Sequence, residues 1–177
     1  PKDCLFIDPA RRDEHGRKTV SIADCTPDVS ALQDLLLQKA EKVMIKLSPM
    51  LDINKALEEL RHVKELHVVA VANECKELDF VLERGFEGAP RIICVNLLTA
   101  QPELRFMQEE ELRCQGRLAD GVMKYLYEPN PAVMKAGCFK LLTERFGVSK
   151  LHKNSNLYTS EQLISDFPGR IFEVEGW

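Results

Sequence analysis

The sequence predicts an α/β fold in which a largely parallel sheet is followed by a small α+β module. Over about the first hundred residues, short runs rich in Val, Ile and Leu alternate with segments of helical period. These runs are almost continuously apolar, as in strands buried on both faces of a sheet. The 177 residues are 45% hydrophobic with a net charge of −4, which is typical of a folded chain and excludes a disordered one.

The first part contains four expected strands and three expected helices. The strands are Cys4–Asp8, Val43–Leu47, Leu66–Ala72 and Arg91–Leu98, and the helices are Asp28–Lys42, Ile53–Val63 and Glu74–Arg84. Asp52 is placed to cap the second helix, and Gly85 is placed to end the third. Because strands alternate with helices, we expect an open and largely parallel sheet. Periodicity does not fix strand direction, so the last strand is compatible with either direction.

The second part differs from the first in its pattern of charged and apolar residues, which predicts a separate α+β module. Pro102–Arg113 is charged and indicates a solvated helix face or a connector, while Leu118–Leu126 fits a helix or a strand. Asn130 and Pro131 predict a helix start, and that helix is expected to run to Arg145 and end at Gly147. Arg170–Val174 alternates like a strand. We therefore divide the chain into residues 1–99 and 100–177, with the second domain incomplete at its end.

Several classes of protein are excluded by composition and spacing. No apolar run approaches the roughly 18–20 residues that a membrane helix needs, so no membrane partner is expected. The six cysteines contain no C-x-x-C pair and the four histidines are scattered, so we expect no metal site. Cysteines in this pattern are expected to be reduced and structural, which favours a cytoplasmic protein. Nothing in the sequence points to DNA.

The sharpest local motif follows the first expected strand and reads Asp8-Pro9-Ala10-Arg11-Arg12. In an open α/β sheet, ligands bind outside the carboxyl ends of the strands. An acid fixed by a proline at this place can hold a polar group of a substrate, and the arginines suit phosphate. Asp-Pro also marks ordinary turns, so a structural role remains the alternative.

Other polar residues fall near the same edge of the expected sheet. Lys46 lies inside an apolar strand, where it must reach an acid such as Asp8 or a ligand. Asn73 and Glu74 follow the third strand, and capping of the next helix is favoured over binding. None of the nine glycines forms a G-x-G, so a nucleotide-type cofactor would be held mostly by residues outside this chain.

A mild basic excess characterises the second part. Between Lys124 and Arg170 there are seven basic and four acidic residues, a local charge of +3, with aromatic residues interleaved. Such a surface suits RNA, and Lys140, Lys150 and Lys153 are the candidate contacts. An ordinary charged surface over an ordinary core explains the same pattern.

Five segments in order resemble one bacterial family. They are Cys4–Lys18, Val43–Ile53, His67–Leu78, Tyr127–Lys140 and Lys150–Arg170. The chain resembles the C-terminal part of class I S-adenosylmethionine-dependent methyltransferases that carry a C-terminal THUMP-like domain. The resemblance implies the second half of a Rossmann-like sheet, with Cys4–Asp8 as its fourth strand, followed by a ferredoxin-like and THUMP-like module.

The resemblance also implies a function and a set of site residues. Asp8, Pro9 and Arg11 occupy the position of a catalytic motif that in many relatives is Asp/Asn-Pro-Pro-aromatic; here Ala10 and Arg11 replace the last two residues. Arg12, Lys46, Asn73, Lys140, Lys150 and Lys153 are then candidates for binding an RNA substrate. The cofactor would be S-adenosylmethionine, with its glycine-rich loop upstream of Pro1, so we expect this fragment alone to be inactive.

Two other functions remain open at this point. One is a non-catalytic RNA-binding or assembly module that retains a methyltransferase-like half-sheet. The other is a methyltransferase for a small molecule or a protein.

Overall fold

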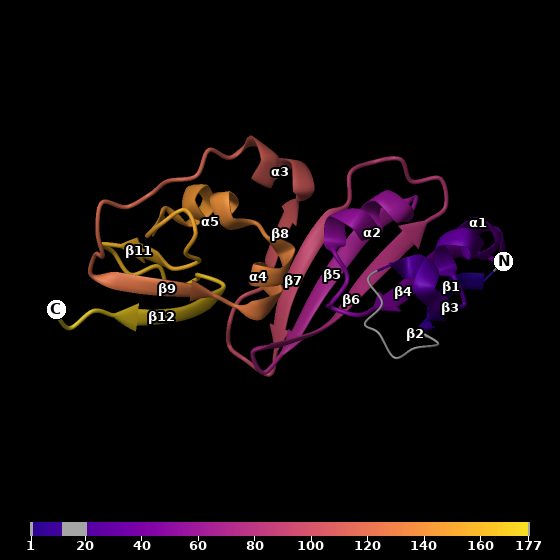
Figure 1. Ribbon diagram of the computed structural model, residues 1–177, viewed down its shortest axis with the longest axis horizontal. Helices are drawn as coiled ribbons and strands as arrows, with labels where there is room; N and C mark the ends of the chain where they lie inside the picture. The colour runs from indigo at the N-terminus through magenta and orange to yellow at the C-terminus, as the bar shows by residue number, and fades with distance from the viewer. Residues whose placement is uncertain (1, 12–20, 177) are drawn as a thin grey trace.

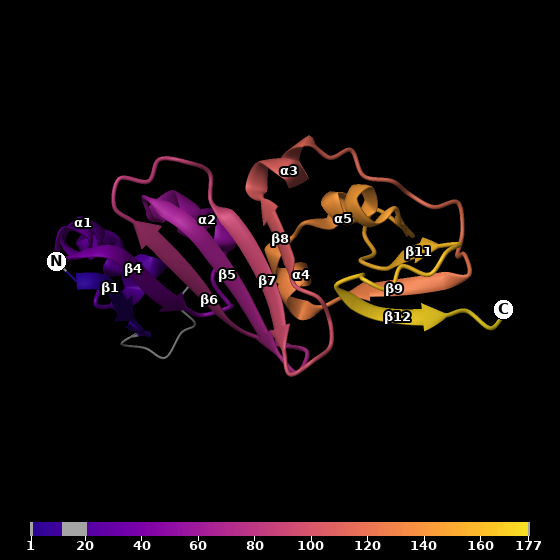
Figure 2. The ribbon, with the colours of Figure 1, turned by 180° about the vertical axis from the view of Figure 1, so that it is seen from behind.

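The computed structural model describes residues 2–11 and 21–176 and contains two main sheets lying side by side (Figure 1). The first part forms a six-stranded sheet in the order β1-β4-β6-β5-β7-β8. Its strands are β1 (Lys2–Ile7), β4 (Ala40–Leu47), β5 (Val63–Val71), β6 (Glu74–Glu83), β7 (Arg91–Leu97) and β8 (Leu104–Met107). The two ends of the chain lie at opposite ends of the molecule (Figures 1 and 2).

The six-stranded sheet is mixed. β1 pairs with β4 in parallel, and β5 pairs with β7 in parallel. β6 lies between β4 and β5 and is antiparallel to both, while β8 is antiparallel to β7. The strands β1, β4, β5 and β7 therefore all run in one direction, and their carboxyl ends share one edge of the sheet. The expected α/β class is confirmed.

The helix expected at Glu74–Arg84 is wrong, because these residues form β6. Leu78, Phe80 and Leu82 lie two apart and are buried on one face, so their period is that of a strand. Ala72 and Asn73 both have positive φ, at 47° and 65°, which closes a two-residue hairpin turn between β5 and β6. Asn73 and Glu74 therefore cap no helix.

The other expected helices of the first part are confirmed with shorter bounds. Helix α1 (Val29–Lys39) begins at Asp28, whose side chain accepts from two backbone N–H groups, and gives way to β4 at Ala40. Helix α2 (Ile53–Glu59) begins at Asp52, whose side chain accepts from the Lys55 N–H. A short pair of strands, β2 (Ala10–Arg11) and β3 (Cys25–Thr26), and one turn of 3-10 helix (Ile22–Asp24) connect β1 with α1.

The segment after residue 99 continues the first sheet before leaving it. The charged stretch Pro102–Arg113 contains β8, which pairs with β7, and the short helix α3 (Gln108–Arg113). The sheet thus extends beyond the expected boundary at residue 99, and the exact domain division stays a prediction.

The second part folds around a four-stranded antiparallel sheet in the order β10-β11-β9-β12. Its elements are β9 (Tyr125–Pro129), α4 (Pro131–Ala136), α5 (Phe139–Phe146), β10 (Ser149–Lys150), β11 (Tyr158–Ser160) and β12 (Gly169–Glu173). The single helix expected from Pro131 to Arg145 is divided at Gly137, whose φ of 74° ends α4. The expected cap at Asn130, the stop at Gly147 and the last strand are confirmed.

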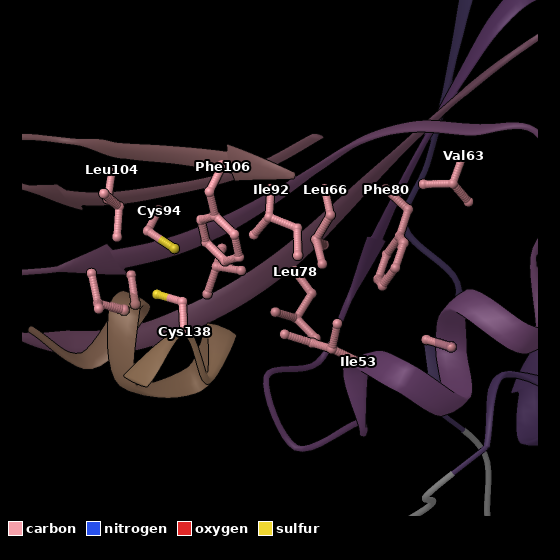
Figure 3. Packing of buried hydrophobic residues seen from close by; sticks show 14 of the residues in the cluster. Ile53, Val63, Leu66, Leu78, Phe80, Ile92, Cys94, Leu104, Phe106 and Cys138 are labelled. Atoms are coloured by element: carbon pink, nitrogen blue, oxygen red, sulfur yellow. The ribbon is translucent and has the colours of Figure 1, made fainter. Parts of the chain in front are cut away.

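One apolar core joins the two parts. The core includes residues from β4 to β8 and from α1, α2 and α4. In Figure 3, Ile53 of α2 points toward Leu78 of β6, and Cys138 faces Cys94 of β7. None of the six cysteines is disulfide-bonded, and four of them are buried. Among the residues that the structure describes, no helix is long and apolar enough to cross a membrane.

Candidate functional site

The residues predicted at the end of the first strand line a small cavity at the carboxyl edge of the sheet. The Lys46 Nζ lies 2.6 Å from Asp8 Oδ2, in a pair whose side chains are 34% and 52% exposed. Pro9 is buried beside them. The cavity measures about 180 Å³, and its remaining wall includes Lys76 and Glu77 of β6. The structure thus brings together Asp8, Pro9 and Lys46, which the sequence placed on different elements.

The charge state of Lys46 determines what this cavity can do. The hydrogen bond to Asp8 raises the pKa of Lys46, and the charges of Asp8, Glu77 and Asp79 add to this effect against partial desolvation. A lysine whose pKa is raised stays protonated at neutral pH. Lys46 therefore orients the Asp8 carboxylate and does not serve as a proton acceptor, whereas the carboxylate can accept a hydrogen bond from a bound amine.

The cavity has a balanced set of charges. Two carboxylates, Asp8 and Glu77, and two ammonium groups, Lys46 and Lys76, line it together. Lys76 also pairs with Glu74 at 2.6 Å. Carboxylates favour a bound ammonium and ammonium groups favour a bound carboxylate, so the arrangement suits a zwitterionic group.

A polar row crosses the sheet behind this cavity. Lys46, Asp79 and His67 are directly opposite one another on β4, β6 and β5. Asp79 is only 9% exposed, and its Oδ1 has no hydrogen-bond partner among the described residues. Burial raises the pKa of Asp79 to about 6; Glu77 adds to the rise, while His67 and Lys46 oppose it. The His67 Nε2 lies 3.1 Å from Glu65 Oε2 at the far end of the row.

Asn73 does not line the Asp8 cavity. It lies in the β5–β6 turn, where its N–H donates to Asn96 Oδ1 and its own Oδ1 accepts from Asn96 Nδ2 at 2.9 Å. These bonds tie the turn to the end of β7. The side chain also borders a second cavity, between the turn and the second part of the chain.

The three candidate RNA contacts lie together in the second part, away from Asp8. Lys140 on α5 and Lys153 after β10 are exposed. Lys150 is half-buried; its Nζ lies 5.1 Å from the centre of the Phe139 ring and donates to the Lys153 carbonyl. Lys150 therefore contributes to local packing, and the other two are more available to a partner.

The arginines of the motif are only partly described. Arg11 lies in β2, where it is opposite Cys25. Arg12 lies outside the described residues. Their expected role toward phosphate stays a prediction.

Sequence reasoning missed the polar residues contributed by β6. Because Glu74–Arg84 was assigned to a helix, Lys76, Glu77 and Asp79 were not placed at the site. The signal was present in the alternation of Glu77, Asp79 and Glu83 with apolar residues, since such a period of two is that of a strand.

Comparison with known proteins relates both parts of the chain to other molecules. A family of ferredoxin-like domains matches residues 125–168. The whole chain is similar to a solved structure described as that of a "putative methyltransferase from Porphyromonas gingivalis W83", with 42% identity over 98% of this chain and a TM-score of 0.89. No curated protein matches the chain at a significant level.

The similarity covers only part of the Porphyromonas protein. This chain spans 43% of the length of that protein. At this identity and coverage the chain is homologous to that part of the protein, and the shared fold includes both sheets. The expected half-sheet followed by a ferredoxin-like module is thereby confirmed.

Proposed function

We propose that this chain is the C-terminal part of an S-adenosylmethionine-dependent methyltransferase that acts on RNA. The observation that carries the proposal is the 42% identity with the Porphyromonas protein over 98% of the chain. The position of Asp8 and Pro9 supports it, because they follow β1 at the edge where ligands bind in α/β sheets.

The residues present fit one end of the cofactor. The amino-acid end of S-adenosylmethionine carries an ammonium and a carboxylate, and the Asp8 cavity offers partners for both. At about 180 Å³, however, this cavity is smaller than the roughly 300–1,000 Å³ of most small-molecule sites. We infer that the nucleoside end is held by residues outside this chain. When bound, the cofactor supplies the methyl group; Asp8 and Lys46 orient what lies in the cavity.

RNA is proposed as the substrate because of the second part. Lys140 and Lys153 are exposed beside the half-buried Lys150, on a ferredoxin-like module with a local basic excess. Phosphate contacts from such residues supply affinity without sequence preference. The cytoplasmic setting expected from the cysteine spacing is compatible with this substrate.

The decisive experiment follows the transfer of a labelled methyl group from S-adenosylmethionine to total cellular RNA by the full-length protein. We expect transfer by the wild type and a loss of at least tenfold in Asp8→Asn, which keeps the shape of the side chain but removes the charge that pairs with Lys46. Asp120→Asn, an exposed carboxylate on a loop of the second part, is the control and should retain activity.

The result also separates the competing functions. RNA binding without methyl transfer would favour a non-catalytic RNA-binding or assembly module. Transfer to protein or to a small molecule, with none to RNA, would overturn the proposed substrate. Calorimetry provides a second check: tight binding of S-adenosylmethionine by the 177-residue chain alone would contradict the inference that its nucleoside end is held elsewhere.

A further inference from the structure

A second cavity, of about 320 Å³, lies where the β5–β6 turn meets the second part of the chain. Its walls come from three elements that are far apart in the sequence. Asn73 belongs to the turn, Asn130 and Met134 to the start and the middle of α4, and Arg170 to β12. The volume falls within the range of small-molecule sites.

Asn130 carries a donor that the fold leaves unused. The residue is 3% exposed, and its Oδ1 accepts hydrogen bonds from the backbone N–H groups of Ala132 and Val133. These two bonds fix the orientation of the amide, since only an oxygen can accept them. The Nδ2 is consequently buried without a hydrogen-bond partner among the described residues. An unsatisfied buried donor costs free energy, and a ligand acceptor that comes within hydrogen-bond distance of it would recover that cost.

Asn73 and Arg170, two other polar residues of the lining, also present donors. The Asn73 Oδ1 accepts a hydrogen bond from Asn96 Nδ2, and this bond orients the exposed Asn73 amide. The Asn73 Nδ2 has no partner among the described residues. The Arg170 Nη2 lies 2.5 Å from Glu128 Oε2 in a pair at the rim. A guanidinium has five N–H donors, so this pair leaves others for a ligand.

The rest of the lining is largely apolar. Pro129, Pro131 and Met134 form these walls, and the Glu128 carboxylate that pairs with Arg170 lies beside them. Gly169 brings β12 close to this region, because a Cβ at that position would lie 2.0 Å from the Glu128 carbonyl oxygen. A cavity with apolar walls, amide donors in its lining and an arginine at its rim is compatible with a heterocycle that carries carbonyl oxygens and a nearby phosphate.

We propose that this cavity binds one base of single-stranded RNA, with Asn73 and Asn130 donating to the base and Arg170 meeting its phosphate. Two amide donors favour a base rich in acceptors, such as uracil, over adenine, which has no carbonyl oxygen. The choice of RNA as the source of the base rests on the proposed function, whereas base binding itself does not depend on methyl transfer.

The position of the cavity gives this binding a role. Asn73 follows β5 and Asp8 follows β1, so both cavities lie at the carboxyl edge of the same sheet. Three strand spacings separate β1 from β5 in the order of the sheet, which corresponds to about 15 Å. A base held at Asn130 would therefore place a nucleotide a few positions along the same strand at the Asp8 cavity, and so select the position that is modified.

The test measures binding of short oligouridine and oligoadenosine to the full-length protein by fluorescence anisotropy, with uridine monophosphate and ribose 5-phosphate as competitors. We expect oligouridine to bind more tightly than oligoadenosine, and uridine monophosphate to compete where ribose 5-phosphate does not. Equal binding of the two oligonucleotides, or equal competition by ribose 5-phosphate, would overturn the assignment.

Two isosteric substitutions test the donors. Asn130→Asp keeps an oxygen to cap α4, as aspartate is an equally good cap, and Asn73→Asp keeps the acceptor for Asn96. Each should weaken oligouridine binding about tenfold, while Asn54→Asp on α2, an exposed asparagine outside the cavity, should leave it unchanged. If Asn130→Asp fails to fold, the variant Asn73→Asp at the exposed position decides alone. Unchanged oligouridine binding by that variant would overturn the proposal.

The outcome is separable from that of the methyl-transfer assay. If oligouridine binding depends on both asparagines and no RNA is methylated, the base site stands and the proposed activity falls. If RNA is methylated and both variants keep the wild-type KM for RNA, the activity stands and the base site falls.

Discussion

Asp79 holds a carboxyl group where water cannot fully solvate it. It lies between Lys46 and His67 on neighbouring strands, with Glu77 nearby, and its pKa is raised to about 6 mainly by burial. Deprotonation is therefore less favourable in the folded state than in the unfolded chain, even though two basic side chains lie in the same row. The group stabilises the fold when neutral, and this contribution is lost as the pH rises.

The sign of this effect predicts that Asp79→Asn gains stability relative to the wild type as the pH rises. The contribution of Asp79 is fully present below its ordinary pKa of 3.8 and is lost as the pH rises through about 6. At about 1.4 kcal/mol per pKa unit, the advantage of Asp79→Asn over the wild type should grow by about 2 kcal/mol between pH 4 and pH 8. Urea denaturation at both pH values measures it.

Asp120→Asn is the matched control for this measurement. Asp120 is exposed on a loop, so its substitution should give the same small difference at both pH values. An advantage of Asp79→Asn that is constant or shrinks toward pH 8 would show that the pKa of Asp79 is not raised in the folded state.

At the scale of single elements, the hairpin formed by β5 and β6 shows what the sequence could and could not predict. The strands β1, β4, β5 and β7 were predictable because their apolar runs are continuous. The strand β6 was not predictable, because its apolar residues also fit a helical period. Pairing with β4 and β5 decided between helix and strand. The error propagated to the site, since β6 carries Glu77 and Asp79.

The candidate site was predictable to a similar extent. Asp8 and Lys46 could be expected at one edge, because Asp8 follows one strand and Lys46 lies near the end of another that runs in the same direction. Their ion pair agrees with the expectation that Lys46 must reach an acid such as Asp8 or a ligand. The cavity lined by Asn73, Asn130 and Arg170 could not be expected, because it forms only where the two parts of the chain meet. Its members are separated by long stretches of sequence, and no local pattern relates them.

The turn of this hairpin predicts a stabilising substitution. Ala72 has a φ of 47°, which an alanine adopts at a cost, and asparagine tolerates this region better. Ala72→Asn is therefore expected to raise the free energy of unfolding by about 0.5–1 kcal/mol. Ala72→Val, whose branched side chain resists a positive φ, should lower it. Thermal unfolding of both variants checks the signs, and a shift of both in the same direction would refute the argument.

At the scale of the whole molecule, the two parts form one continuous framework. Helix α4 packs against β5, β6 and β7 although it belongs to the second part, and the Lys135 Nζ donates to the Leu51 carbonyl at 2.8 Å. Residues of α4 and of the central sheet share one core cluster. Lys140 and Lys153 therefore belong to a part of the chain that is held against the sheet that carries Asp8, and an RNA bound by them would have a defined orientation relative to the Asp8 cavity.

This arrangement predicts how RNA binding should depend on salt. Each phosphate contact makes the negative slope of log affinity against log salt concentration steeper by about 0.7 for a single strand. The double variant Lys140→Glu/Lys153→Glu removes two exposed cations from the second part and should therefore make that slope shallower by about 1.4, with weaker binding at low salt. Lys150 is left in place because it packs on Phe139, so the loss of affinity can be assigned to charge and not to unfolding.

The control Lys39→Glu/Lys55→Glu changes the charge equally on α1 and α2 of the first part, and its slope should remain that of the wild type. Anisotropy titrations at several salt concentrations give both slopes; equal shifts in the two variants would mean that RNA senses only net charge, and an unchanged slope in the first would place the RNA surface elsewhere.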